Sequence, residues 1–140
     1  MSDEDIPQLT PYALMGGKQG IDDLVNRFYD AMDTLPEART IRAMHGPDLT
    51  VIRHVLKLYL GQWLGGPQDY SRERGHPMLR GRHLGFAIGM AERDAWMQCM
   101  DSALAQVHCE PEVRAHVRQA MANLADWMRN LPGEPPPGQG

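Results

Sequence analysis

RERGHPMLRGRHLGFAIG (Arg72–Gly89) contains four arginines, four glycines, one proline and two histidines. The glycines and Pro77 argue against one long helix. The arginines suggest that the segment binds an anion, and the histidines, His76 and His83, suggest that it binds a metal. The question that decides the fold and the function is whether either histidine is a metal ligand.

Length and composition fit one soluble domain. The chain has 140 residues, of which 42% are hydrophobic and 23% charged, and its formal net charge is −4. This charge disfavours binding to nucleic-acid phosphates. No apolar run approaches the roughly 20 residues of a membrane helix, and the acidic start MSDEDIPQLT is unlike a signal peptide. Two cysteines, Cys99 and Cys109, are too few for a disulfide framework and indicate a reduced, cytoplasmic protein.

Apolar residues at helical spacing predict four amphipathic helices, and no segment shows the alternation of a strand. The first helix follows Gly16-Gly17, the second ends at Gly65-Gly66, and the fourth begins at Pro111. We expect the buried faces of the four helices to be, in order, Ile21, Leu24, Val25, Phe28, Tyr29 and Met32; Leu49, Ile52, Leu56, Tyr59, Leu60 and Trp63; Ala95, Trp96, Cys99, Met100, Ala103 and Val107; and Val113, Val117, Ala120, Met121, Leu124 and Met128.

Shorter elements are predicted from their capping residues. Thr10 followed by Pro11 predicts the start of a short helix before Gly16. Thr34 and Glu37 have the spacing of a capping box, which predicts a short helix from there to about residue 43. Asp48 is predicted to cap the second long helix.

The rest of the chain is expected to be irregular. Residues 67–88 form a loop of about 20 residues, with at most a short helix near Pro77–His83, and a loop this long is usually functional. We expect a flexible segment over residues 1–9, one all-α domain over residues 10–131, and a disordered Pro/Gly-rich tail over residues 132–140.

Two other kinds of site, a zinc site and a nucleophilic cysteine, are disfavoured. A zinc site at His108, Cys109 and His116 has no recognisable ligand spacing, because the chain contains no HExxH pair and no CxxC pair. Cys99 lies on an apolar helix face, where a cysteine is more often part of the core than a nucleophile.

A histidine that binds haem iron is another interpretation. Haem needs an imidazole ligand, apolar walls and cationic groups near its propionates. His83 has such neighbours in the sequence, namely Arg80 and Arg82 for charge and Leu84 and Phe86 for the walls. A single histidine is more often structural, so the residues by themselves leave both interpretations open.

Longer motifs make the sequence recognisable. NRFYDAM (26–32), MHGPDL (44–49), WLGGPQDYSRERGHPMLRGRHLGFAIG (63–89) and AERDAWMQCM (91–100) together resemble group II of the truncated haemoglobins. The resemblance runs from about Tyr12 to Arg129. It implies a shortened globin fold, in which two helix pairs form a 2-on-2 sandwich around haem b.

The resemblance also implies roles for individual residues. His83 matches the proximal histidine that binds haem iron. Tyr29 and Trp96 match the distal residues that donate hydrogen bonds to a bound ligand, and His45 matches a third polar distal residue. The other residues implied to line or anchor the haem are Ile52, Leu56, Tyr70, Arg82, Phe86 and Met97, of which Tyr70 and Arg82 resemble propionate contacts.

Three positions depart from the family pattern. Gly85 stands where many relatives have a proline after the proximal His-Leu pair. Val55 stands where relatives often have a lysine or arginine, so one propionate ion pair is absent from the pattern. MHGPDL carries an additional glycine, Gly46, which affects the orientation of His45.

The expected function is binding of oxygen or another diatomic ligand at a histidine-ligated iron. Several distal donors would stabilise a ligand that gains negative charge, which predicts slow oxygen release and favours redox or detoxification chemistry over transport. A secondary peroxidase or nitric-oxide oxidoreductase activity, with an unidentified reductase, fits this pocket. The alternatives are a cofactor-free helical interaction module and a dedicated haem peroxidase. A homodimer is expected by analogy only, and no nucleic-acid or membrane partner is expected.

Overall fold

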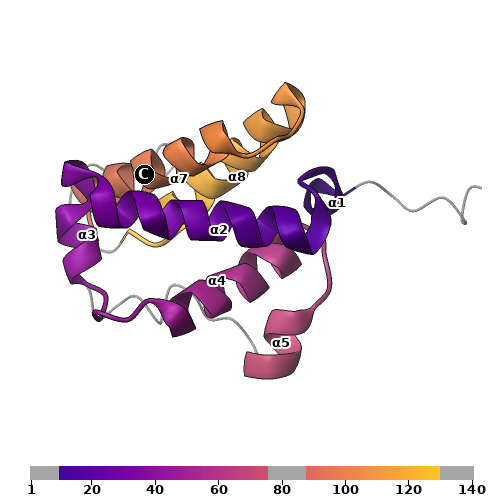
Figure 1. Ribbon diagram of the computed structural model, residues 1–140, viewed down its shortest axis with the longest axis horizontal. Coiled ribbons are helices and arrows are strands. Elements are labelled where there is room, and N and C mark those ends of the chain that lie inside the picture. Colours follow the sequence, from indigo (N-terminus) through magenta and orange to yellow (C-terminus); the bar gives the residue numbers. More distant parts are fainter. Residues whose placement is uncertain (1–9, 76–87, 130–140) are drawn as a thin grey trace, which may run out of the picture.

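The computed structural model describes residues 10–75 and 88–129, and these residues form helices without any strand (Figure 1). The all-α prediction is therefore confirmed. The elements in chain order are α1 (Pro11–Leu14), α2 (Gly17–Thr34), the 3-10 helix η2 (Pro36–Ala38), α3 (Arg39–Ala43), α4 (Thr50–Trp63), α5 (Asp69–Arg74), α7 (Met90–Gln106) and α8 (Pro111–Trp127).

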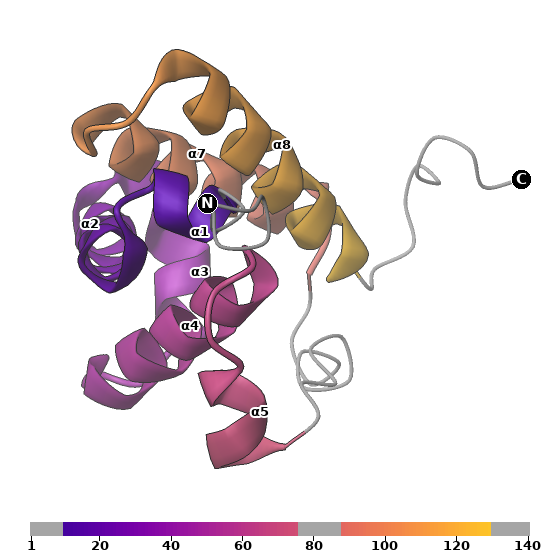
Figure 2. The same ribbon diagram turned by 90° about the vertical axis from the view of Figure 1, so that its right-hand side faces the viewer.

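Two helix pairs make up the body of the fold. Helix α2 packs against α4, α7 packs against α8, and the two pairs meet mainly through α2 and α7 (Figures 1 and 2). The predicted 2-on-2 arrangement is confirmed. The core between the pairs is apolar, because the buried face of α2 meets methionines, alanines and Cys99 from α7. No helix in the described ranges is long and apolar enough to cross a membrane.

The apolar periodicities predict most of the buried faces. All six residues expected from the first helix are buried, and so are Ala95, Cys99, Met100, Ala103 and Val107 of the third. In the second helix only Leu49 and Leu60 are buried, whereas Ile52, Leu56 and Tyr59 are partly buried against the core. The prediction for Trp63 is wrong, since 41% of its surface is exposed. Leu64 takes the interior position at the end of α4 instead, and Trp63 stacks on Tyr59 with ring centroids 6.2 Å apart.

The predicted capping residues have mixed outcomes. Thr10 caps α1 as expected, because its hydroxyl accepts a hydrogen bond of 3.1 Å from the backbone N–H of Ala13. The short helix predicted up to about residue 43 is confirmed as η2 and α3, but its predicted cap is wrong. Thr34 ends α2, and its hydroxyl donates to the carbonyl of Asp30 at 3.0 Å. The N-cap of α4 is Leu49, one residue later than predicted, although the Asp48 carboxylate accepts from the backbone N–H of Thr50 at 2.9 Å.

Helix α5 lies inside the segment that was expected to be irregular. Its position is set by α4, because the side-chain amide of Gln62 donates to the Ser71 hydroxyl at 2.8 Å and accepts from the Ser71 backbone N–H at 2.9 Å. The neighbouring Tyr70 is almost fully buried. The expected helix near residues 77–83, the flexible residues 1–9 and the disordered tail lie outside the described residues.

Helix α1 closes against the end of α4 at the second glycine pair. The backbone N–H of Tyr12 donates to the carbonyl of Leu64 at 2.9 Å, and Gly65 has a φ of 98°, which only glycine adopts readily. A Cβ atom at Gly66 would lie 2.5 Å from the ring of Tyr12 and 2.7 Å from the carbonyl oxygen of Gly61. The glycine pair therefore allows the turn and the close approach of two helices.

Gly66→Ala should lower the free energy of unfolding by about 1–3 kcal/mol, because the added methyl group must displace a packed ring or a backbone carbonyl. Urea denaturation followed by circular dichroism measures this. Gly46→Ala is the matched control, since a Cβ there meets nothing within 4 Å, and it should change stability by less than about 0.5 kcal/mol. Equal effects of the two substitutions would contradict the packing account.

Candidate functional site

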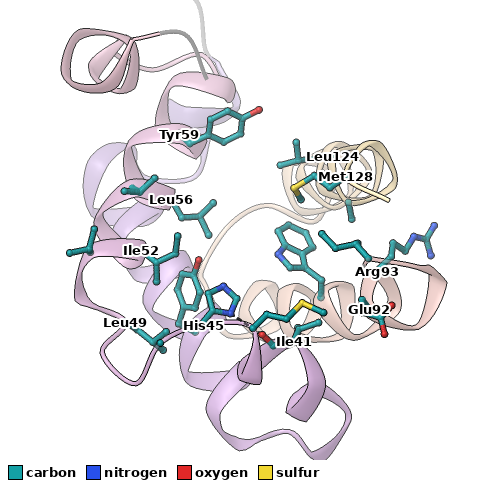
Figure 3. A pocket seen from close by; sticks show the side chains of 18 of the residues that line it. Ile41, His45, Leu49, Ile52, Leu56, Tyr59, Glu92, Arg93, Leu124 and Met128 are labelled. Atoms are coloured by element: carbon teal, nitrogen blue, oxygen red, sulfur yellow. Dashed lines mark hydrogen bonds between the residues drawn. The ribbon is translucent and has the colours of Figure 1, made fainter. Parts of the chain in front are cut away.

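A cavity of about 500 Å³ lies between the two helix pairs (Figure 3). Ile52 and Leu56 of α4 form one wall, Leu124 of α8 and the C-cap residue Met128 lie opposite, and His45 lies at one end. The lining is mainly apolar, and the volume is within the range of roughly 300–1,000 Å³ that is typical of small-molecule and cofactor sites. The cavity is therefore large enough for an organic ligand or cofactor.

Tyr29 of α2 brings a hydroxyl to this cavity. Its ring is only 3% exposed and packs edge-on against Phe28, with centroids 4.9 Å apart, and against His45, with centroids 6.0 Å apart. Burial raises the pKa of Tyr29 well above its ordinary value, although the nearby Arg53 opposes the shift. The phenol is thus a neutral hydrogen-bond donor, and no residue of the described ranges accepts its proton.

Trp96 of α7 brings a second donor. It lies 5.0 Å from Phe28 between ring centroids, is partly buried and lines the cavity. The indole N–H can only donate, and within residues 10–75 and 88–129 it has no hydrogen-bond acceptor. Phe28 contacts both Tyr29 and Trp96, so one core side chain supports both donors.

His45 lies in the turn after α3, and its orientation is set by one hydrogen bond. Its Nδ1 is 2.8 Å from the carbonyl oxygen of Ile41. Because a carbonyl only accepts, Nδ1 must carry the proton, and Nε2 of the neutral ring then has a free lone pair. Neutral His45 can therefore accept a hydrogen bond through Nε2 but cannot donate one, which differs from the expected third donor.

The turn that carries His45 is held by Arg42. The Arg42 guanidinium donates to the carbonyl oxygens of Gly46 at 2.9 Å and Pro47 at 3.3 Å, and it also forms an ion pair with Asp33 of α2. Gly46, the additional glycine of the MHGPDL motif, thus supplies one of the carbonyl oxygens through which Arg42 holds the turn. This bracing fixes the turn from which His45 reaches the cavity.

Two tyrosines line another part of the cavity. Tyr59 of α4 and Tyr70 of α5 pack edge-on with ring centroids 5.5 Å apart, and burial raises the pKa of Tyr59. In Figure 3, Tyr59 lies at the opposite end of the cavity from His45. Val55, which stands where relatives often carry a cation, also lines the cavity. Helix α5 also brings Arg74 to the cavity, so an aromatic pair and a cation line it from α4 and α5.

The predicted site residues fall into three sets. The cavity brings together Tyr29, His45, Ile52, Leu56, Tyr70 and Trp96. Met97 is buried in the core and is not among the described residues that line the cavity, because it follows Trp96 on the helix and points elsewhere. His83, Arg82 and Phe86 lie outside the described residues, as does the departure at Gly85.

Other lining residues were not predicted. Leu124 and Met128 were expected only as core, because apolar periodicity cannot separate a core contact from a pocket wall. Arg74 and Arg93 also line the cavity, and Arg93 is bound to Asp126 and Asp94 at 2.7 Å each. The motif RDAW contains Arg93, but nothing in the sequence distinguishes a cavity arginine from a surface one.

The alternative chemistries gain no support in the described part of the chain. No group of three or more His, Cys, Asp or Glu side chains there is close enough to bind a metal ion. Cys99 is buried, and burial, with a smaller contribution from Glu37, raises the pKa of its thiol to about 11. A thiol with this pKa stays protonated near neutral pH and is a poor nucleophile.

The hydrogen-bond donors of the cavity bear on whether a haem with its ligand fits there. Tyr29 and Trp96 both line the cavity and have no hydrogen-bond acceptor among the described residues, so their donors are available to an acceptor that enters the cavity. Haem with a diatomic ligand has the required chemistry, because the macrocycle matches the apolar walls and the ligand offers acceptor atoms. The residues present therefore fit the group.

Comparisons with known proteins agree with this site. The model of the bacterial-like globin family matches residues 10–130. A group 2 truncated haemoglobin of Bacillus subtilis is 39% identical over 104 residues, which cover 74% of this chain and 76% of that protein.

Two solved structures are also similar. A cold-adapted truncated haemoglobin of Pseudoalteromonas haloplanktis is 41% identical with a TM-score of 0.84, covering 87% of this chain and 98% of that one. A group II 2-on-2 haemoglobin of Agrobacterium tumefaciens is 40% identical with a TM-score of 0.84, covering 93% and 98%. Family, sequence and fold agree over nearly the whole described chain, and the protein belongs to the bacterial-like globins, within the group II truncated haemoglobins.

Proposed function

We propose that this protein binds haem b in the cavity and holds oxygen, or another diatomic ligand, with hydrogen bonds from Tyr29 and Trp96. The observation that carries the proposal is the pair of donors in an apolar cavity, neither of which has an acceptor among the described residues. Haem supplies the iron that binds the ligand and shifts negative charge onto it. Donors directed at this charge make strong, charge-assisted hydrogen bonds.

The two donors would slow release of the ligand. A hydrogen bond to a charged group contributes about 1.5–3 kcal/mol, so two such bonds correspond to several orders of magnitude in a dissociation rate. An oxygen carrier must release its ligand readily. Slow release therefore supports a redox or detoxification role, in which a secondary peroxidase or nitric-oxide oxidoreductase activity has time to act.

His45 would have a different role from the two donors. With Nδ1 committed to Ile41, the Nε2 lone pair can accept a proton from a hydroxyl or from a protonated ligand in the cavity. Neutral His45 therefore does not add a third hydrogen-bond donor to Tyr29 and Trp96. Ile52 and Leu56 line the same cavity as Tyr29 and His45, and these apolar side chains would help to exclude water from the bound ligand.

His83 would bind the iron, and Arg82, Tyr70 and Phe86 would contact the haem. His83 belongs to the segment between Arg74 and Ile88, and both of these flanking residues line the cavity. The chain therefore leaves and rejoins the described structure at the cavity itself. The proposal includes a globin domain over residues 10–131, a cytoplasmic location, a reductase that returns the iron to the ferrous state, and a homodimer by analogy with the group.

Hemin titration of the purified full chain tests the proposal. We expect saturable binding of one hemin per chain, accompanied by a Soret band and by quenching of tryptophan fluorescence, because Trp96 lines the cavity. A chain that stays colourless and takes up no hemin would support the cofactor-free interaction module and overturn the proposal.

A further inference from the structure

We propose that Arg53 is a positioning residue that acts through Tyr29 and makes the pocket favour ligands on which negative charge accumulates over neutral ligands such as carbon monoxide. The inference rests on the proposed function, since it concerns the strength of one of the distal donors. It assigns a role to a side chain that does not itself line the ligand cavity.

The first observation is the contact between Arg53 and the ring of Tyr29. The guanidinium carbon of Arg53 lies 5.6 Å from the centroid of the Tyr29 ring, within the range of a cation–π interaction. Tyr29 lines the ligand cavity, whereas Arg53 lines a separate hollow on the outer side of α2 and α4. The arginine therefore reaches the ligand site only through the tyrosine.

The second observation is that the guanidinium is fixed in place. Its Nη1 donates to the backbone carbonyl of Asn26 at 3.0 Å and to the Asn26 side-chain oxygen at 3.3 Å, and its Nη2 forms an ion pair of 3.0 Å with Asp30. Both acceptors belong to α2, the helix that carries Tyr29. The side chain is only 21% exposed, so its charge is partly shielded from water.

The physical consequence concerns the phenol hydroxyl. A cation beside the aromatic ring stabilises negative charge on the phenol oxygen, so the O–H becomes a stronger hydrogen-bond donor. The same contact restricts rotation of the ring and keeps the hydroxyl directed at one point in the cavity. A ligand that gains negative charge benefits from both effects, whereas a neutral ligand benefits little.

Asp30 has the opposite electrostatic effect on Tyr29. Its carboxylate neutralises part of the Arg53 charge, so removing the carboxylate should strengthen the positive field at the ring. The two oxygens of Asn26 remain as anchors for the guanidinium in that case. Substitutions of Arg53 and of Asp30 should therefore change the positive field at Tyr29 in opposite directions. If the ion pair had only a structural role, the two substitutions would not have effects of opposite sign.

The experiment uses the haem-loaded full chain and the variants Arg53→Met and Asp30→Asn. In Arg53→Met, the stretching frequency of bound carbon monoxide should rise and oxygen should dissociate roughly 2–5-fold faster, as expected for loss of a cation–π contact. In Asp30→Asn, the frequency should fall and oxygen release should slow. Arg53→Lys should restore part of the wild-type frequency, since it keeps the charge.

Arg118→Met is the matched control. Arg118 forms a two-point ion pair with Asp101, at 2.7 and 3.1 Å, which links α7 to α8, and it does not line the cavity. Its loss should affect stability without changing the carbon monoxide frequency. The inference is overturned if Arg53→Met leaves the frequency unchanged, or if Arg53→Met and Asp30→Asn shift it in the same direction.

A measurement without haem separates this inference from the proposed function. With tyrosine labelled at the ring carbon that bears the hydroxyl, the Tyr29 resonance of the haem-free chain should shift in Arg53→Met and not in Arg118→Met, with Tyr29→Phe identifying the signal. If the Tyr29 resonance does not shift in Arg53→Met, the contact between Arg53 and the Tyr29 ring is contradicted. If the signal shifts but the chain takes up no hemin, the contact stands and the proposed function fails.

Discussion

Replacing Tyr29 with Phe should accelerate oxygen dissociation from the haem-loaded protein by about 10- to 150-fold. This range corresponds to the loss of one hydrogen bond of about 1.5–3 kcal/mol to a ligand that carries negative charge. Phe keeps the ring contacts to Phe28 and His45, so the folded state should lose little stability. Stopped-flow mixing of the oxygenated protein with excess carbon monoxide measures the rate.

Tyr59→Phe is the matched control for this prediction. Tyr59 also lines the cavity, but it lies at the opposite end from His45 (Figure 3). Its substitution should leave the oxygen dissociation rate nearly unchanged, whereas Trp96→Phe should increase the rate because it removes the second donor. If Tyr29→Phe released oxygen no faster than Tyr59→Phe, the distal donor account would be wrong.

Local periodicity predicts the helices well because each one buries a single face. The six residues expected from α2 are all buried, and the glycine pair at Gly65-Gly66 ends α4 as predicted. Predictions failed where tertiary contacts decide. Trp63 has the spacing of a buried residue, yet the chain turns immediately after it, and Leu64 fills the core.

Capping patterns were less reliable than apolar periodicity. Thr34 and Glu37 have the spacing of a capping box, but the Thr34 hydroxyl donates backwards to Asp30 and ends a helix rather than beginning one. Helix α5 was missed because its short sequence has no apolar stripe, and it is held instead by Gln62 and by burial of Tyr70. Such contacts between distant residues are invisible to a local pattern.

The candidate site could be predicted only in part from the residues. Tyr29 and Phe28 lie on the same apolar stripe, and nothing in the periodicity distinguishes the one that lines the cavity. Family resemblance singled out Tyr29, Trp96 and His45, but it could not supply the hydrogen bond from His45 to Ile41 that changes the histidine from donor to acceptor. That bond depends on the path of the turn after α3.

The second large effect is expected at His83. His83→Gly should remove the protein ligand of the iron, so hemin should dissociate much faster and the absorption spectrum of the ferrous protein should change. Added imidazole should restore the wild-type spectrum, because it can supply the missing ligand from solution. This rescue separates loss of a ligand from loss of the fold.

His76→Gly provides the matched control, since His76 lies seven residues before His83 in the same segment. The most direct test of the account is therefore the ferrous spectrum of the wild type, His83→Gly and His76→Gly, each with and without imidazole. We predict that only His83→Gly differs from the wild type and that only this variant responds to imidazole. An unchanged spectrum in His83→Gly, or an imidazole-rescued change in His76→Gly, would contradict the assignment of His83 as the iron ligand.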